Sequence, residues 1–379
     1  MDNRVSSLLH RLRALLKKEA VLMIAAAAAL LSAVFVPPDG EYAAYIDWRV
    51  ISLLFCLMAV VAGITRVGLF HLLSCRLASR VRGTRSLTLL LTLLCFFASM
   101  LITNDVALLT FVPFTILVVN LADQPGLLIP LVTLETVAAN LGSMLTPVGN
   151  PQNLYLYAYY HLTPGDFYAV TLPLTGLSLL LITALALLPR NRVLAVSLEK
   201  PAAVRSRPRL CLHLALFVLC LLTVFGLVPY PAALTAVILC LLLFDRPVFR
   251  AVNYSLLLTF LCFFIFVGNL GRIDAVRDTL VGLIAGRELT AAALLSQILS
   301  NVPAAVMLSG FTDNGPALLA GTNIGGLGTL VASLASLISF RLYAAAPGAR
   351  PGRYLAVFTG VNLLLFALLL AAAFLLGMG

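Results

Sequence analysis

Leu101-Ile-Thr-Asn-Asp-Val-Ala-Leu-Leu-Thr110 interrupts a long apolar run with a polar group centred on Asn104, and a second apolar run follows at once. A weaker version occurs at Leu299-Ser-Asn-Val-Pro-Ala304, centred on Asn301. Lipid cannot hydrogen-bond a backbone that leaves the helix, so such breaks persist only where protein buries them or where they line a wet cavity. Two breaks in corresponding places of two similar halves predict a transporter substrate site near the middle of the bilayer.

The composition is that of a polytopic membrane protein. The 379 residues are 61% hydrophobic and 11% charged, whereas a soluble domain carries about 25% charged residues. The mean hydropathy is +1.06. Many apolar runs reach the roughly 20 residues that a helix needs to span a bilayer. The net charge of +10 is interpreted as a signal of membrane orientation rather than of nucleic-acid binding.

The sequence lacks the motifs of common enzymes and of ATP-driven pumps. It has no HExxH, GxSxG or P-loop sequence. Its four histidines are scattered, and its seven cysteines lie mostly inside apolar runs without metal-ligand spacing. We therefore predict that the protein is not an enzyme, that it binds no nucleic acid, and that it needs no cofactor beyond a coupling Na⁺ or H⁺.

Hydropathy and charge divide the chain into two halves with a basic segment in front and a linker between them. The basic segment is followed by a first transmembrane helix at about 20–36, and we expect it to remain uncleaved. The predicted domains are 1–48 (basic segment and first helix), 49–188 (first repeat), 189–209 (cytoplasmic linker) and 210–379 (second repeat).

Both halves show the same order of elements: a span, a charged surface helix, a hairpin, a broken helix and a last span. Sequence identity between the halves is low, so the predicted repeat rests on this order. The first half places these elements at 49–65, 66–82, 86–121, 127–161 and 167–188. The second half places them at 252–270, 272–287, 289–313, 316–343 and 353–377, after two further spans at 210–228 and 231–244.

The positions of Lys and Arg support one topology. If each hairpin enters and leaves the membrane on the same side and the N-terminus is cytoplasmic, all but four of the 25 Lys and Arg lie on the inner side. The number of crossings is then about nine, or eleven if both limbs of the first hairpin cross fully. Either number gives the halves opposite orientations, so we predict inverted repeats. The four exceptions are Arg49, Arg272, Arg277 and Arg287.

Four polar breaks are expected to converge on one site. Two are the hairpin tips, and the others are the polar segments 142–153 and 321–328 of the broken helices. A helix N-terminus carries unpaired N–H groups and about half a positive charge, so it binds an anion without Arg or Lys. The glycines in these segments allow close approach of backbone to a ligand. The alternative is that the breaks are kinks packed by neighbouring helices.

Two carboxylates lie at membrane depth, where such groups are costly and usually functional. Asp105 is a candidate Na⁺ ligand or proton carrier, or alternatively a cap of the second hairpin limb. Glu135 either faces the same cavity or pairs with a surface charge, and Asn140 is a candidate for the same cavity. The four tyrosines between 155 and 160 are expected in an aromatic belt at the membrane boundary.

At these residues the chain resembles the ion transporter superfamily. This group includes the divalent anion/sodium symporters, the citrate–metal symporters, the arsenite/antimonite permeases and some sodium/proton antiporters. Ser300-Asn301-Val302 and Thr103-Asn104-Asp105 are similar to the Ser-Asn-Thr signatures of the family's hairpin tips. Thr146-Pro-Val-Gly-Asn-Pro-Gln-Asn153 and Gly321-Thr-Asn-Ile-Gly-Gly-Leu-Gly328 resemble the segments that follow the two hairpins.

The resemblance implies a scaffold that forms a homodimer, and a transport domain with two re-entrant hairpins and two broken helices that moves as an elevator. Both tips and both broken helices would form the substrate and cation sites. The expected substrate contacts are Thr103, Asn104, Pro147, Asn150, Ser300, Asn301, Thr322 and Asn323. The expected cation-coupling residues are Asn104, Asp105, Gly149, Asn150, Asn301, Gly325 and Glu135.

The sequence therefore predicts an all-α protein of the plasma (inner) membrane with about 9–11 transmembrane helices. Its predicted function is secondary active transport of a small inorganic or organic anion, coupled to Na⁺ or H⁺. The alternative within the same fold is a sodium/proton antiporter in which Asp105 is the exchanging group. A channel and a membrane-bound enzyme are less consistent with inverted repeats, occluding hairpins and the lack of a catalytic cluster.

Overall fold

The computed structural model describes residues 19–78, 81–193 and 204–378. The basic segment 1–18 and residues 194–203 of the predicted linker therefore lie outside the described residues. Within the described part, the chain is 79% helical and has no strand, apart from one isolated bridge between Gly83 and Val193. Eight helices are long and apolar enough to cross a membrane. The predicted all-α membrane class is confirmed.

The helices follow the predicted order in both halves. Those before the linker are α2 (Ala20–Phe35), α3 (Tyr42–Tyr45), α4 (Trp48–Val67), α5 (Leu69–Ala78), α6 (Thr84–Ile102), α7 (Asn104–Leu121), η1 (Pro125–Leu127), α8 (Leu128–Ser143), α9 (Pro151–Tyr159) and α10 (Pro164–Ala186). Those after it are α11 (Arg207–Val224), α12 (Tyr230–Phe244), η2 (Arg246–Ala251), α13 (Tyr254–Gly271), α14 (Asp274–Ile284), α15 (Glu288–Leu299), α16 (Asn301–Ser309), α17 (Gly315–Gly325), α18 (Leu334–Ala344) and α19 (Pro351–Leu375).

The two hairpins differ in length. Helices α6 and α7 have 19 and 18 residues, and each is long enough to cross a bilayer. Helices α15 and α16 have 12 and 9 residues. At about 1.5 Å per residue, α16 extends for only about 14 Å, roughly half of a 30 Å hydrocarbon core. The second hairpin is therefore too short for either limb to cross by itself.

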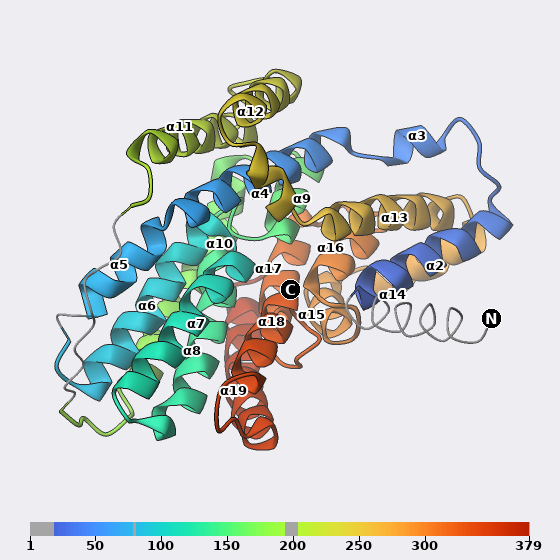
Figure 1. Ribbon diagram of the computed structural model, residues 1–379. Coiled ribbons are helices and arrows are strands. Elements are labelled where there is room, and N and C mark those ends of the chain that lie inside the picture. Colours follow the sequence, from blue (N-terminus) through green and yellow to red (C-terminus); the bar gives the residue numbers. More distant parts are fainter. Residues whose placement is uncertain (1–18, 79–80, 194–203, 379) are drawn as a thin grey trace, which may run out of the picture.

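The two halves are packed crosswise: helices of one half pack against helices of the other, so the halves are not separate units side by side. Figure 1 shows α11 and α12 as a pair outside α4, and α2 alongside α13. Near the middle of the molecule, α7 packs against α18 and α9 packs against α16. Each half therefore supplies the packing partners of the other, and the two hairpins come together between them.

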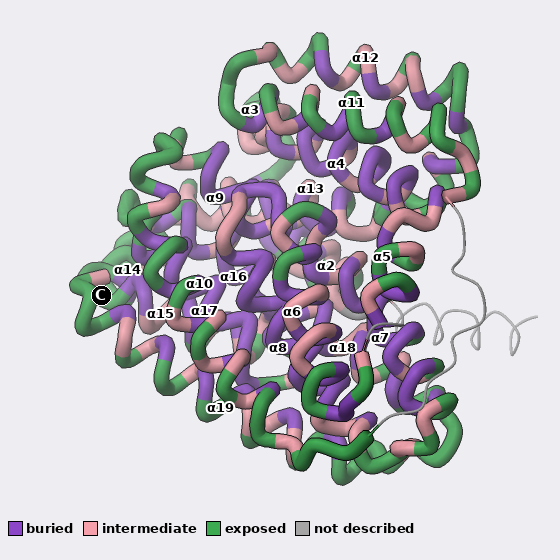
Figure 2. The backbone as a smooth tube through the Cα atoms, turned by 90° about the vertical axis from the view of Figure 1, so that its left-hand side faces the viewer, coloured by how far each residue is buried: buried purple, intermediate pink, exposed green. Residues whose placement is uncertain are grey.

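Helix α8 forms the centre of the core. Every residue from Leu131 to Ser143 is buried, whereas α11 and α12 are largely intermediate or exposed, as the pink and green of Figure 2 show. A helix that is buried all round needs neighbours on every side, and α8 packs against α6, α7, α10, α18 and α19. Its polar side chains are consequently held away from both lipid and bulk water.

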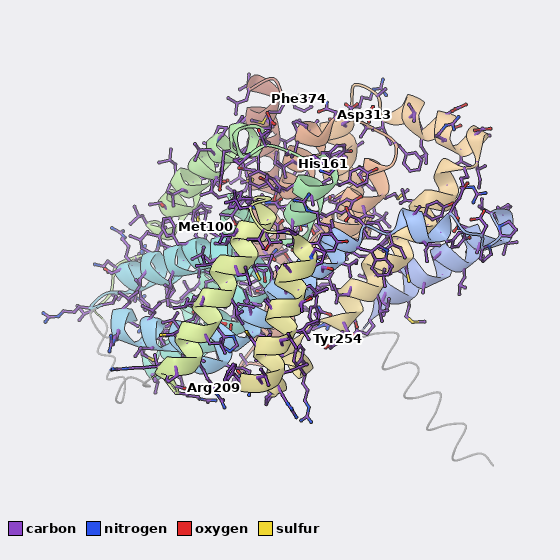
Figure 3. All side chains as sticks on the ribbon, turned by 90° about the horizontal axis from the view of Figure 1, so that it is seen from above. Met100, His161, Arg209, Tyr254, Asp313 and Phe374 are labelled. Carbon is purple, nitrogen blue, oxygen red and sulfur yellow. The ribbon has the colours of Figure 1, made fainter. Side chains whose placement is uncertain are left out.

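Four residues that are labelled in Figure 3 mark two sides of the molecule. Figure 3 places Arg209 and Tyr254 toward one side of this view and Asp313 and Phe374 toward the opposite side. The predicted topology assigns these two groups to opposite sides of the membrane.

The second broken helix corrects one prediction. The break was expected at 321–328, but α17 continues to Gly325 and the irregular segment covers residues 326–333. The reason is helix packing: a Cβ on Gly321 would lie 2.5 Å from the Leu289 carbonyl oxygen, and one on Gly325 would lie 2.6 Å from Ser296 Oγ. These glycines let α17 approach α15 closely, and they do not interrupt the helix.

The predicted aromatic belt is also wrong for two of its tyrosines. Tyr155 and Tyr157 are only 1% and 5% exposed. Tyr155 Oη forms a 2.6 Å hydrogen bond with Ser309 Oγ, so the ring joins α9 to α16. Tyr159 is 40% exposed, as expected for a residue at the membrane boundary. Tyr155 and Tyr157 are buried because α9 packs against helices of the other half, so that one face of this short helix points toward the core.

A buried ion cluster joins α4, α11 and the end of α12. Asp245 is 3% exposed, and its carboxylate lies 3.0 Å from His213 Nε2 and 3.4 Å from Arg66 Nη1. A Cβ on Gly63 would lie 2.0 Å from the His213 ring, so this glycine leaves the space that the ring occupies. The cluster fixes the outer helix pair to the centre of the molecule.

We expect Asp245→Asn to lower the free energy of unfolding by about 1–3 kcal/mol, because it removes the buried partner of the cluster while keeping its shape. Arg66 is 41% exposed, so water compensates part of the loss. Thermal unfolding in detergent measures the effect. Asp278→Asn, which alters an exposed pair with Arg277, is the control and should change stability by less than about 1 kcal/mol. Equal stability of the two variants would contradict the proposed role of the cluster.

Candidate functional site

The two hairpin tips have the same backbone structure. Thr103 has φ 68° and ψ 150°, and Ser300 has φ 79° and ψ 153°. This region of backbone space is almost restricted to glycine, and it costs other residues about 1–3 kcal/mol each. Both tips have this strained backbone although neither residue is glycine. The surrounding structure must therefore hold both tips firmly in place.

Each tip is held by the broken helix of its own half. The backbone N–H of Asn104 donates to the Gly149 carbonyl at 3.1 Å, and that of Asn301 donates to the Ala332 carbonyl at 2.9 Å. In both tips the asparagine Oδ1 accepts a hydrogen bond of 3.0 Å from the backbone N–H of the next residue. The carbonyl end of each side chain is therefore turned back onto the start of the second limb.

Further contacts recur in the two halves at the same residue spacing. Thr146 Oγ1 donates to the Met100 carbonyl at 2.5 Å, and Thr329 Oγ1 donates to the Gln297 carbonyl at 3.0 Å. In the same register, Gly142 lies against Ser99 as Gly325 lies against Ser296. The predicted correspondence between the halves thus extends from the order of the elements to individual hydrogen bonds.

Two helix asparagines connect the halves. Asn140 in α8 and Asn323 in α17 stand at the same distance along the chain before Gly149 and Ala332. Asn323 Nδ2 donates to Asn153 Oδ1 at 2.7 Å, and its Oδ1 accepts from Asn150 Nδ2 at 3.2 Å. The network buries polar groups with their partners, which is the condition for keeping them in a core.

Asn140 of the first half makes the corresponding contacts to the second half. Its Oδ1 accepts from Ser333 Oγ at 3.1 Å, and its Nδ2 donates to Ser336 Oγ at 3.3 Å. The same Oδ1 also accepts from Asn104 Nδ2 at 3.1 Å. A single amide therefore links the first hairpin tip to the second broken helix.

The two tips meet at a cavity of about 110 Å³. The starts of α9 and α18 also line it, so four helix N-termini point at one place. Its charged side chains are Asp105, Glu19 and Arg341. The polar and charged residues of the lining are Glu19, Asn104, Asp105, Gln152, Asn253, Ser255, Thr259, Ser300, Asn301, Ser333 and Arg341.

The structure brings most of the predicted site residues together, in two layers. Asn104, Asp105, Ser300 and Asn301 line the cavity itself. Behind them, Thr103, Gly149, Asn150 and Asn323 belong to the strained tip and to the hydrogen-bond network that supports it. Pro147 is buried within the first break.

Three predicted residues lie elsewhere. The Thr322 hydroxyl donates to the Leu318 carbonyl of its own helix at 2.8 Å, so it is engaged within α17. The Gly325 carbonyl accepts from Gln297 Nε2 at 2.9 Å. Glu135 is fully buried between α8 and α7, and it does not line the cavity. Its Oε1 accepts from Thr115 Oγ1 at 2.5 Å.

The sequence analysis did not identify several residues that line the cavity. For one of them, Ser333, the sequence contains a pattern that could have indicated it. Ser333, Ser336 and Ser339 recur every three residues, so they fall on one face of α18. Arg341 follows on the same helix and reaches the cavity. Gln152 lies just inside α9, where only the fold shows that it faces the tips.

Comparison with known proteins supports the interpretation of these features. The chain is 33% identical over 313 residues to an uncharacterized transporter of Methanocaldococcus jannaschii, covering 82% of this chain and 85% of that protein. It is 33% identical over 323 residues to the inner membrane protein YbiR of Escherichia coli, covering 81% and 83%. The silicon efflux transporter LSI3 of Oryza sativa subsp. japonica is 37% identical over 139 residues, covering 34% and 27%.

A family model fits the same region of the chain. It is described as a citrate transporter and matches residues 12–318, which include both hairpin tips and the first broken helix. The long relatives are named as a transporter and as an inner membrane protein. Together with the all-helical structure and its eight apolar helices, the match shows a multi-pass membrane transporter and not an enzyme. The chain belongs to the citrate transporter family.

Proposed function

We propose that the protein is a secondary active transporter that moves a small inorganic or organic anion and couples it to Na⁺ or H⁺. The observation that carries the proposal is the meeting of both hairpin tips at one cavity. The tips belong to different halves and are tied to different broken helices. A ligand between them contacts both halves, so their relative movement can open the site to one side or the other.

The cavity suits an anion. Helices α7, α9, α16 and α18 all begin at its wall, and each N-terminus contributes unpaired N–H groups and a partial positive charge. Arg341 adds a full positive charge, which offsets part of the negative charge of Asp105 and Glu19 in the same lining. Citrate is the first candidate substrate because the family is described as citrate transporters. Silicic acid is a further candidate substrate because one relative is named a silicon efflux transporter.

The cavity also contains a feature that favours coupling to a cation. Asp105 lies in the first turn of α7, half-buried at the cavity wall. A carboxylate beside a bound anion is repulsive unless a cation or proton accompanies it. The same residue favours the second candidate function, a sodium/proton antiporter, in which Asp105 exchanges the two cations without an anion.

The expected transport mechanism follows from the matched halves. We propose that they are inverted repeats with re-entrant hairpins, and that one domain moves as an elevator relative to a dimeric scaffold. The recurrence of tip geometry and hydrogen bonds supports the repeat. The distribution of Lys and Arg supports the inversion and a cytoplasmic N-terminus in the inner membrane. The prediction that the protein forms a homodimer rests on the family resemblance.

A thermal-stability scan of the purified protein tests the proposal. Citrate, succinate, sulfate, phosphate, arsenite and silicic acid are added in Na⁺ or K⁺ buffer at several pH values, because a ligand of the folded state raises its apparent stability. A ligand at 100 times its Kd adds about 2.7 kcal/mol. We expect at least one anion to stabilise the protein in a Na⁺- or pH-dependent way. A response to Na⁺ and pH that no anion modifies would instead establish the antiporter.

A further inference from the structure

Glu135 is a buried carboxyl group with incomplete hydrogen bonding. The side chain is 0% exposed in the centre of α8. Its Oε1 accepts the Thr115 hydroxyl, while its Oε2 has no hydrogen-bond partner. An unpaired buried carboxylate costs several kcal/mol. The neutral acid costs less, although its O–H still lacks an acceptor. The arrangement is therefore poor for stability in either form.

The other half of the molecule shows that the fold does not require a carboxyl group here. Leu318 stands at the same position relative to Asn323 as Glu135 does relative to Asn140, and it is also 0% exposed. A leucine therefore fills the matching place in α17 without a polar group. The cost of Glu135 is not explained by packing, and ionisable residues kept at membrane depth under these conditions usually serve transport.

The groups around Glu135 leave it without a cation. The titratable side chains that face it are Cys95 from α6 and Tyr354 from α19. Helix α7 contributes the Thr115 hydroxyl. Among the described residues, neither these helices nor α10, α17 and α18 form an ion pair with Glu135. No fixed positive charge compensates the carboxylate, so a proton is the cation that fits this place.

Glu135 lies on the same helix as Asn140, which reaches the tip, and its chain neighbour Thr136 begins a series of contacts to a second cavity. Asn140, further along α8, bonds to the tip residue Asn104. Thr136, the neighbour of Glu135, is hydrogen-bonded to Ser339, and Ser339 Oγ lies 3.2 Å from Tyr354 Oη. The Tyr354 ring stacks on Tyr343 with centroids 4.6 Å apart. Tyr343 in turn lines a separate cavity of about 430 Å³.

We propose that Glu135 is a proton-binding site of the transport cycle. It holds a proton in the conformation described here. When the movement of α7 and α8 admits water, the O–H bond of the carboxyl breaks, the proton passes to water and the carboxylate remains. This inference rests on the proposed transport function and names H⁺ as a coupling ion. Asp105 remains the carboxylate of the substrate cavity, and Glu135 acts at a second place on the same pair of helices.

Infrared difference spectroscopy tests proton binding without a known substrate. Membrane-reconstituted protein is shifted between acidic and alkaline buffer, and the carbonyl band of a protonated carboxyl group is followed. We expect a band in the wild-type protein that disappears at alkaline pH and is missing in Glu135→Gln. Glu288→Gln is the matched control, because Glu288 is also buried and lies 3.3 Å from a threonine hydroxyl. The proposal is overturned if the full wild-type band remains in Glu135→Gln.

Transport assays in liposomes test coupling, with radiolabelled citrate as the probe. An inward proton gradient is expected to accelerate citrate entry by the wild-type protein. Glu135→Gln is expected to lose this acceleration and to keep citrate exchange at equal pH. If it fails to fold, Glu135→Leu replaces it, since Leu318 fills the matching position. Unchanged acceleration in the variant, or none in the wild type, overturns the proposal. If citrate does not enter at all, the substrate assignment fails, and the infrared result alone decides on Glu135.

Discussion

The Asn104→Ala protein is expected to fold and to lose transport by about ten- to a hundredfold. The substitution removes the amide that donates to Asn140 and the oxygen that accepts from the Asp105 N–H. The substitution also removes any hydrogen bond from this amide to a charged ligand, and such a bond is worth about 1.5–3 kcal/mol, or about ten- to a hundredfold in a rate or affinity. The tip would keep its backbone bond to Gly149, so it would remain in place without its ligating side chain.

Liposome uptake of the anion found by the stability scan measures this loss. Leu117→Ala is the control: Leu117 lies on the same helix, is exposed, and is far from the tips in sequence. It is expected to transport like the wild type, and both variants are expected to elute as folded protein. Wild-type transport by Asn104→Ala would show that the first tip does not form the substrate site. Asn301→Ala provides an independent repeat of the test in the other half.

The Gly142→Ala substitution is expected to lower both the stability of the protein and its transport. A Cβ at this position would lie 2.1 Å from the Phe96 carbonyl oxygen and 2.7 Å from Ser99 Oγ. The first of these is backbone, so α8 has to move away from α6. Overpacking of a core costs about 1–3 kcal/mol, and the displacement would also move Asn140 away from the first tip. We expect lower thermal stability together with lost transport.

Gly176→Ala is the matched control for this variant. Gly176 also lies within a helix, but a Cβ there meets nothing within 4 Å. An exposed glycine-to-alanine change inside a helix is favourable by up to about 1 kcal/mol. The two variants are therefore expected to shift the unfolding temperature in opposite directions. A Gly142→Ala protein as stable as the wild type would mean that α6 and α8 do not pack as closely as described.

The sequence was sufficient to predict where the helices break. Thr103 and Ser300 are polar residues within apolar runs, and both mark real interruptions with strained backbone. The pattern works because the membrane removes the alternative of solvating an open backbone. Glycine was less reliable: Gly325 ends a helix that the glycine-rich run was expected to break earlier, since glycine serves close packing as well as irregular backbone.

The contacts between the halves could not be predicted. Asn140 was a candidate, but its partners Ser333 and Ser336 lie almost two hundred residues later in the chain. No local pattern encodes which residues meet across such a separation. Glu135 shows a related limit, because its residue type marks it as costly at membrane depth while the direction of its side chain depends on how α7 and α8 pack.

The crosswise packing affects how the protein folds during its synthesis on the ribosome. Helix α2 emerges early, but its partner α13 begins only at Tyr254. At about 5–20 residues per second, the interval between them is roughly 10–40 s. Helix α7 waits about as long for α18, and α9 waits a shorter time for α16. A nascent chain must therefore remain in the membrane with many helices unpaired, and cellular quality control has a long time in which to recognise truncated or slowly translated copies.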